Sequence, residues 1–178
     1  MPRYVALLRA VNVGGTAKLP MKDLATIVAE LGGANVRTYI QSGNVVFEAP
    51  ARSASKLPSA LEAAIEERFG FRRPVILRSA TELHAVLDSN PFIQRGVDTS
   101  RLYVGFLQAR PSGSVDALDA ARSAGEEFEL DGKELYLHFP IGVGRTRLTN
   151  QYIDRVMGTV STIRNWRTVL TLASMAAS

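Results

Sequence analysis

The chain has 178 residues, a formal net charge of +4 and no cysteine. This length fits one domain or two small, similar halves. The absence of cysteine excludes disulfide scaffolds, thiolate zinc sites, iron–sulfur clusters and thiol nucleophiles. Because His84 and His138 are the only histidines, a histidine-rich metal site is excluded too, and we expect no metal; cofactors are left unknown.

The positive charge is concentrated in the two terminal segments. Residues 1–47 hold five basic and two acidic side chains, and residues 140–178 hold five and one, whereas residues 48–139 hold eleven and fourteen. The local field at the ends is therefore stronger than a net charge of +4 implies. The uncharged run 4–8 is too short for a signal peptide, and 168–178 is too short to span a membrane. We expect a cytosolic protein that does not bind membranes.

The first 78 residues predict strands and helices in the order βαββαβ, which is typical of a ferredoxin-like unit. A two-residue turn, Ser42-Gly43, is expected to join the second and third strands. The predicted elements are a strand over 3–11, a helix from Pro20 to about 31, strands over 35–41 and 44–48, a helix over 55–69 and a strand over 73–78.

The same order recurs further along the chain. Ser79 and Glu82 predict a capping box that begins a short helix ending before Pro91. The later predicted elements are a strand over 102–108, a helix over 114–124, strands over 127–130 and 134–139, a helix over 149–157, a strand over 160–163 and a last helix from about 165, with Trp166, Val169, Leu170 and Ala173 facing inward. We expect an α+β fold of two tandem ferredoxin-like halves, 1–78 and 101–178, with a linker helix and loop over 79–100 or one compact domain. The repeat is in the order of elements, with none detected between individual residues.

This topology predicts two polar clusters. In a βαββαβ unit the first two strands run parallel, so the loop 12–19, the hairpin 41–44 and Arg9 meet at one edge of the first sheet. In the second half the third and fourth strands share an edge, which gathers residues 142–150 and 162–166. If the halves pack head to tail, both clusters border one cleft.

The residues of the first cluster suit anion binding, although simpler explanations exist. The loop from Asn12 to Lys18 joins a strand to a helix, and its glycines free backbone amides. The spacing matches neither nucleotide-binding glycine motif, so the glycines could equally serve a tight turn. The ligand-binding candidates here are Arg9, Asn12, Gly14, Gly15, Lys18, Gln41, Ser42, Gly43 and Asn44.

The second cluster places arginines beside the start of a helix. Guanidinium groups near helix amides suit phosphate or carboxylate, and a solvated loop is the alternative. Asn165 is better explained as a helix N-cap, and Trp166 as a core residue. The candidates are Arg145, Arg147, Thr149, Asn150, Arg164 and Asn165.

Other motifs are weaker. Residues 102–107 resemble an RNA-recognition strand, but the segment 133–139 lacks the glycine its partner strand requires. His138 is expected to be a solvated residue on the sheet, beside Tyr136. The sequence contains neither a Ser-His-Asp order nor a zinc-binding motif, so the catalytic residues are unknown. Ser42 is the best of the weak candidates for a nucleophile.

Several long motifs resemble the domain of unknown function 1697 family. They are residues 4–15, Met21, residues 36–47, Asn90-Pro91-Phe92, residues 148–150 and residues 164–170. The chain departs from the family at Thr146-Arg147, where Ser-Lys is more common, and at Ala10, where Gly is common. The resemblance implies a cytosolic, mainly bacterial α+β protein with no established activity.

We expect the chain to bind a small anionic or phosphorylated ligand, such as a nucleotide or metabolite, between the two halves. An RNA- or other nucleic-acid-binding module is the alternative. A hydrolase or transferase is the second alternative, and the oligomeric state is left open.

Overall fold

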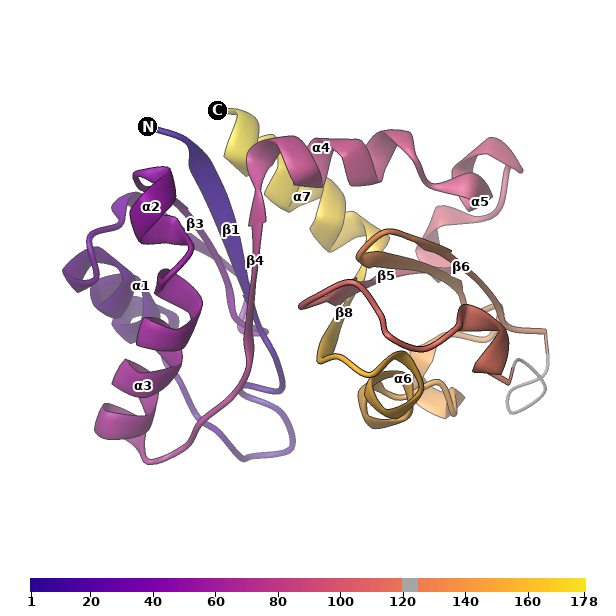
Figure 1. Cartoon of the computed structure of the whole chain (residues 1–178), viewed down its shortest axis with the longest axis horizontal. Helices are drawn as coiled ribbons and strands as arrows, with labels where there is room; N and C mark the ends of the chain where they lie inside the picture. The colour runs from indigo at the N-terminus through magenta and orange to yellow at the C-terminus, as the bar shows by residue number, and fades with distance from the viewer. Residues whose placement is uncertain (120–124) are drawn as a thin grey trace. The chain divides into compact units, whose positions relative to one another are not determined.

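The computed structural model describes residues 1–119 and 125–178 and has an α+β fold with two four-stranded antiparallel sheets. The chain divides into two compact units (Figure 1). Unit 1 comprises residues 1–84 and 172–178, and unit 2 comprises residues 85–171. The divisions fall within α4 (Ala80–Asp88) and α7 (Trp166–Ala177).

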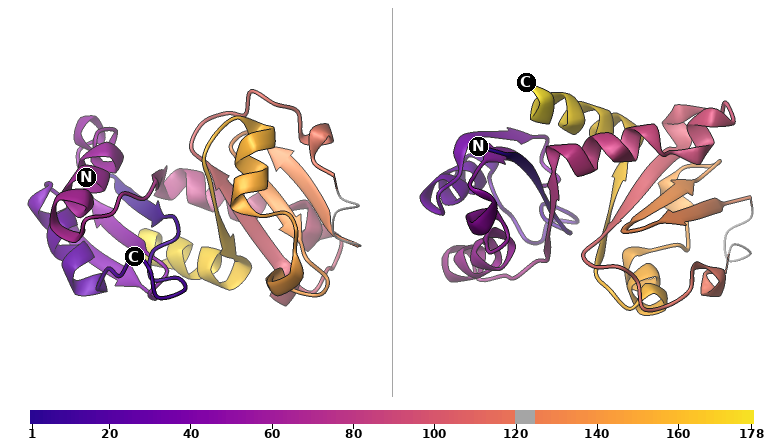
Figure 2. Two further views of the ribbon diagram at one scale, coloured as in Figure 1. Left: turned by 90° about the horizontal axis from the view of Figure 1, so that it is seen from below. Right: turned by 45° about the horizontal axis from the view of Figure 1, so that its top comes forward.

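Unit 1 is a sheet whose one face is covered by helices. Its strand order is β2-β3-β1-β4. The side chains of Leu8, Phe47 and Val75 lie on the covered face of the sheet. They form a core with helix residues Leu24, Ile27 and Leu61. Figure 2 shows the helices side by side on that face. The elements are β1 (Arg3–Leu8), α1 (Met21–Glu30), β2 (Ala34–Tyr39), β3 (Asn44–Glu48), α2 (Ala51–Ala54), α3 (Leu57–Phe69) and β4 (Val75–Ser79).

Two local details differ from the predictions. The expected helix over 55–69 corresponds to α3, with Pro58 in its first turn, where a missing N–H costs nothing, and the short helix α2 before it was not predicted. The β2–β3 hairpin closes at the pair Tyr39–Asn44, so its loop has four residues, 40–43, and not two. The predicted capping box is confirmed: Ser79 N donates to Glu82 Oε2 at 2.8 Å, and Glu82 N donates to Ser79 Oγ at 3.1 Å.

Unit 2 has the strand order β6-β7-β5-β8, with α6 packed on one face of its sheet. The helix expected over 114–124 is a short 3₁₀ helix at Val115–Ala117, and residues 120–124 lie outside the described residues. The other elements are α5 (Pro91–Gln94), η1 (Thr99–Arg101), β5 (Leu102–Leu107), β6 (Glu127–Asp131), β7 (Glu134–His138), η4 (Val143–Arg145), α6 (Asn150–Met157) and β8 (Ser161–Asn165).

Three expectations about single side chains in unit 2 can be compared with the structure. Trp166 is 4% exposed, as expected for a core residue, whereas Leu170 is 45% exposed, because Leu172 instead follows Val169 on the buried stripe of α7. The histidine expected in solvent, His138, has a side chain only 15% exposed. Its ring packs 5.8 Å from that of Phe92, which covers this part of β7.

The pairing of β1 with β4 and of β5 with β8 has the same register in the two sheets. In unit 1, Tyr4 pairs with Ser79 and Val5 with Arg78; in unit 2, Tyr103 pairs with Asn165 and Val104 with Arg164. Arg78 and Arg164 therefore occupy equivalent positions, and both are buried, with exposures of 1% and 7%.

Candidate functional site

The predicted meeting of the 12–19 loop and the 40–43 hairpin is confirmed, and Asn12 joins them. Its side-chain amide donates to the carbonyl oxygens of Leu19 and Gln41, both at 2.8 Å. Its Oδ1 accepts from Leu19 N at 2.7 Å, and its own N–H donates to Ala17 O at 3.0 Å. Asn12 thus holds the two loops in one arrangement, which we call the loop pair (residues 10–19 and 40–43).

The backbone of the loop pair is unusual in its conformation. Seven of its residues have a positive φ, and four of these are not glycine, although side chains disfavour this region. Such left-handed residues persist where surrounding bonds fix them, and they gather at binding and active sites. The seven residues are Ala10, Asn12, Gly14, Gly15, Ala17, Ile40 and Gly43.

One of these residues, Ala10, adopts a conformation that suits glycine better than alanine. Ala10 has φ 55°, a value that glycine adopts without strain. Ala10 is exposed, so its methyl group is accommodated at the cost of backbone strain alone.

The charge of the loop pair is positive. Lys18 is exposed and Arg9 is half-buried, and residues 9–20 and 40–44 contain no acidic side chain. Arg73 adds a third cation, because its Nε donates to Ala10 O at 3.4 Å. The sequence reasoning missed Arg73. The signal was available, because an antiparallel partner of β1 must begin beside the end of β1, and Arg9 N indeed donates to Pro74 O at 3.0 Å.

The other candidates of unit 1 divide into structural and accessible residues. Asn44 is fully buried, and its amide donates to Tyr39 O at 2.9 Å and to Ser42 Oγ at 3.0 Å, which fixes the hairpin loop. Gly43 is buried against Val11 and Leu8. Gln41, Gly14 and Gly15 are exposed and accessible to a ligand.

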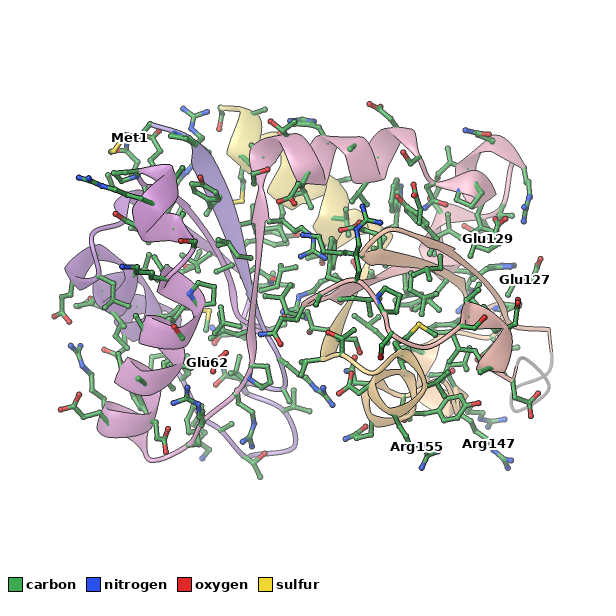
Figure 3. All side chains as sticks on the ribbon, in the orientation of Figure 1. Met1, Glu62, Glu127, Glu129, Arg147 and Arg155 are labelled. Carbon is green, nitrogen blue, oxygen red and sulfur yellow. The ribbon has the colours of Figure 1, made fainter. Side chains whose placement is uncertain are left out.

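In unit 2, Arg145 and Arg147 lie on the loop 142–149, and Figure 3 shows Arg147 pointing away from the sheet. Arg145 and Arg147 are both exposed. Thr149 is the N-cap of α6, since its side chain accepts from Tyr152 N at 3.3 Å. Thr146 anchors the loop by donating to Glu126 Oε2 at 2.9 Å.

The remaining candidates of unit 2 lie apart from one another. Asn150 Oδ1 accepts from Ser161 Oγ at 3.3 Å, at the start of β8. Arg164 lies at the other end of that strand, about 10 Å further at the usual rise per residue. Asn165 is confirmed as a helix cap, because its Oδ1 accepts from Thr168 N at 2.8 Å.

Arg164 is held by short contacts within its own strand. Its Nη1 donates to Thr162 Oγ1 at 2.8 Å and to Ile163 O at 3.0 Å. Burial lowers its pKa to about 10, because removal from water disfavours the charged form. The guanidinium therefore stays charged at neutral pH.

The described residues were also compared with the requirements of a metal site, a membrane span and a nucleophile. Within 1–119 and 125–178, no group of three or more His, Asp or Glu side chains is placed to hold a metal ion. The helices described there are all too short or too polar to cross a membrane. Ser42 Oγ accepts a hydrogen bond from the side-chain amide of Asn44 at 3.0 Å. The meeting of the two polar clusters at one cleft stays a prediction.

Comparison with known proteins places this architecture in a family. The family model described as "Protein of unknown function (DUF1697)" matches residues 1–136. No curated protein matches the chain. Among solved structures, the conserved bacterial protein SP0830 from Streptococcus pneumoniae is similar, with a TM-score of 0.71 and 21% sequence identity over 100% of this chain and 99% of the other. That identity supports a shared fold alone. Because the family model covers more than half of the sequence, the chain belongs to the family "Protein of unknown function (DUF1697)".

Proposed function

We propose that the loop pair of unit 1 binds a small anionic ligand, such as a nucleotide or a phosphorylated metabolite. The observation that carries this proposal is the bridge made by Asn12, whose hydrogen bonds within the chain hold two loops with left-handed residues together. A site fixed in advance loses less conformational entropy on binding, so fewer contacts suffice for affinity.

The chemistry around the bridge favours an anion. Arg9, Lys18 and Arg73 supply positive charge, and a guanidinium group binds phosphate or carboxylate through paired hydrogen bonds. The exposed amides of Gly14 and Gly15 lie on the same loop and add donors that carry no side chain. In this proposal Gln41 contacts polar groups of the ligand, whereas Asn12 and Asn44 position the loops.

A thermal-shift screen of nucleotides and phosphorylated metabolites tests the proposal. A ligand at 100 times its Kd stabilises the folded state by about 2.7 kcal/mol, which is readily detected. We expect the shift to be lost in the double variant Arg9→Gln, Lys18→Gln and kept in Lys22→Gln, Arg68→Gln, a matched double variant of exposed cations in the same unit. Uniformly flat responses, or equal shifts in both double variants, would contradict it.

The alternatives have less support. A nucleic-acid surface needs exposed aromatic rings for stacking, but Phe106 of β5 is 1% exposed and Tyr136 of β7 is 2% exposed. Tyr136 instead donates its hydroxyl proton to Val86 O at 3.3 Å. Hydrolase or transferase activity, and a cytoplasmic location, stay predictions.

We also propose that each unit has a ferredoxin-like topology. Two observations support this: both sheets are antiparallel with the first strand between the third and the fourth, and the paired residues of β1–β4 and β5–β8 correspond one to one. The topology explains the loop pair, because β1 and β2 both run antiparallel to β3 and therefore end at the same edge.

A further inference from the structure

Three pockets in the described part of the chain differ in the partners of their cationic side chains. In the pocket beside β2 and β3, Arg3 pairs with Glu48 at 3.0 Å and Arg37 donates to Met175 O, so both arginines have partners. In the pocket beside β6, Arg95 pairs with Glu129 at 2.9 Å. Figure 3 shows Glu127 and Glu129 at the edge of that strand.

The third pocket lies in the helical layer of unit 1 and has a volume of about 380 Å³. It is formed where α1 ends and where α2 passes into α3. Its lining residues are Leu31, Arg52, Ser53, Lys56, Leu57 and Ala60. This volume falls within the range of small-molecule sites, which begins at about 300 Å³.

The two cationic side chains that line this pocket form no bonds within the described residues. Arg52 and Lys56 are exposed, and neither side chain forms a hydrogen bond or ion pair with any residue in 1–119 or 125–178. The lining contains no acidic side chain. The formal charge of the lining residues is therefore +2. In the other two pockets a carboxylate pairs with the arginine: Glu48 with Arg3 and Glu129 with Arg95.

The floor of the pocket is apolar. Leu57 is 3% exposed and belongs to the core of unit 1, and Leu31 packs against that core. Ala60, one turn further along α3, leaves space above this floor. A ligand that combines an anionic group with a short apolar group would engage both surfaces.

The start of α3 adds an electrostatic reason for an anion. The first turn of this 13-residue helix has no acidic residue, and its N-cap is Lys56, which makes no side-chain capping bond. A cation at the positive end of a helix is unfavourable, and a negative charge there is favourable. A bound anion would offset the repulsion between Arg52, Lys56 and the helix.

We infer that this pocket is a second site of the protein, one that binds a small soluble amphipathic anion: a phosphate or carboxylate carrying a short apolar group. The anionic group lies between Arg52 and Lys56, and the apolar group lies on Leu31 and Leu57. The site is distinct from the loop pair, and neither site depends on the other.

Titration of ¹⁵N-labelled protein with phenyl phosphate, followed by amide chemical shifts, tests the inference. We expect saturable shifts at residues 52–60. Inorganic phosphate and phenol should bind more weakly, because phosphate contacts only the cations and phenol only the apolar floor. Exposed ion pairs contribute up to about 1 kcal/mol, so loss of one cation should weaken binding about two- to fivefold, and Arg52→Gln, Lys56→Gln together about tenfold or more.

Three matched variants make the result decisive. Lys22→Gln removes an exposed cation near the other end of α1, about 13 Å along the helix, and should leave binding unchanged. Arg9→Gln, Lys18→Gln should also bind normally, which separates this site from the loop pair. Ala60→Leu fills the pocket without a change in charge and should weaken binding.

The inference is overturned if Arg52→Gln, Lys56→Gln binds phenyl phosphate as tightly as the unmodified protein, or if inorganic phosphate binds equally well. Binding to vesicles of anionic lipid with no response to phenyl phosphate would also overturn it, since a membrane headgroup would then be the ligand. All variants change exposed or partly exposed positions. Circular dichroism of each variant is the control that checks that it is folded.

Discussion

The side-chain amide of Asn12 donates a 2.8 Å hydrogen bond to the main-chain carbonyl of Gln41, 29 residues away. This bond joins the loop that follows β1 to the loop that follows β2. Asn12 itself has φ 56°, a conformation that asparagine tolerates better than most residues. Asn12 therefore combines a left-handed backbone conformation with a side-chain donor that reaches the neighbouring loop.

Replacement of Asn12 by alanine should destabilise the protein by about 2–4 kcal/mol, because three side-chain hydrogen bonds are lost and each contributes about 1 kcal/mol. Asn12→Asp is the matched control, since it keeps the acceptor for Leu19 N and tolerates the same φ. We expect a smaller loss for Asn12→Asp in urea denaturation. An equal loss for the two variants would mean that the acceptor bond from Leu19 N contributes little and that the donor bonds to Leu19 O and Gln41 O account for the loss.

The convergence of these loops was predictable from element order alone, because parallel first and second strands must end at one edge. The contribution of Arg73 was missed, although the same pairing rule places the start of β4 beside the end of β1. The register of the 40–43 hairpin was missed for a different reason. Ser42-Gly43 resembles a two-residue turn, but buried Asn44 binds Tyr39 O and closes a four-residue loop.

The correspondence of the two units was also hidden in the sequence. The buried strands share Tyr-Val at residues 4–5 and 103–104, a match too short to stand out in 178 residues. It becomes evident only when the strand pairing aligns Arg78 with Arg164. Short strands carry few residues each, and their register depends on turn geometry and on which face is buried, so a two-residue match does not reveal it.

Two glycines of the loop pair should respond differently to substitution by alanine. Gly14 has φ +59°, and no atom lies within 4 Å of an added Cβ, so Gly14→Ala should cost about 1–2 kcal/mol from backbone strain alone. Gly43 has φ +84°, and its Cβ would lie 2.6 Å from Val11 Cγ2 and 2.8 Å from Leu8 Cβ. Overpacking of a core adds about 1–3 kcal/mol.

Urea denaturation of the two variants checks this order. We expect Gly43→Ala to unfold at a clearly lower urea concentration than Gly14→Ala, with the same slope for both. Equal midpoints would show that Leu8 and Val11 move aside at no cost. In ligand-binding assays Gly14→Ala keeps the amide donor, so a loss of affinity there would reflect a changed loop conformation.

The carboxylate of Glu48 should make stability depend on pH in the acid range. Arg3 donates to Glu48 Oε1 at 3.0 Å and Asn35 donates to Glu48 Oε2 at 3.0 Å, and these bonds lower the pKa of Glu48 below its ordinary value of 4.5. Because the folded state has the lower pKa, the stabilisation is fully present above 4.5. It is lost as the pH falls through the folded-state value.

Urea midpoints measured from pH 3 to pH 8 test this dependence. The difference between the unmodified protein and Glu48→Gln should be constant near neutrality and should shrink below pH 4.5. The control is Glu67→Gln, since Glu67 forms no hydrogen bond or ion pair with any residue in the described ranges. If the Glu48→Gln difference did not change between pH 8 and pH 3, the bonds to Arg3 and Asn35 would not favour the charged form.

Equivalent positions in the two sheets predict equivalent responses for Arg78 and Arg164. In each case Nη1 donates to the carbonyl of the preceding residue, Leu77 or Ile163, at 3.0 Å. A lysine carries the same charge, but its ammonium group lacks the rigid, planar set of donors that allows this local bond together with others. Arg78→Lys and Arg164→Lys should therefore each destabilise the protein by about 1–3 kcal/mol, the cost of leaving buried polar groups unsatisfied.

Arg167→Lys is the control, because Arg167 is exposed on the first turn of α7 and its side chain has no bonding partner among residues 1–119 and 125–178. Its effect should stay within about 0.5 kcal/mol. Arg164 also donates to Thr162 Oγ1 at 2.8 Å, and the residue at the corresponding position beside Arg78 is Ile76. We expect Arg78→Lys and Arg164→Lys each to be more destabilising than Arg167→Lys in urea denaturation, and a loss as small as that of Arg167→Lys would show that the bonds of the buried guanidinium groups do not set the cost.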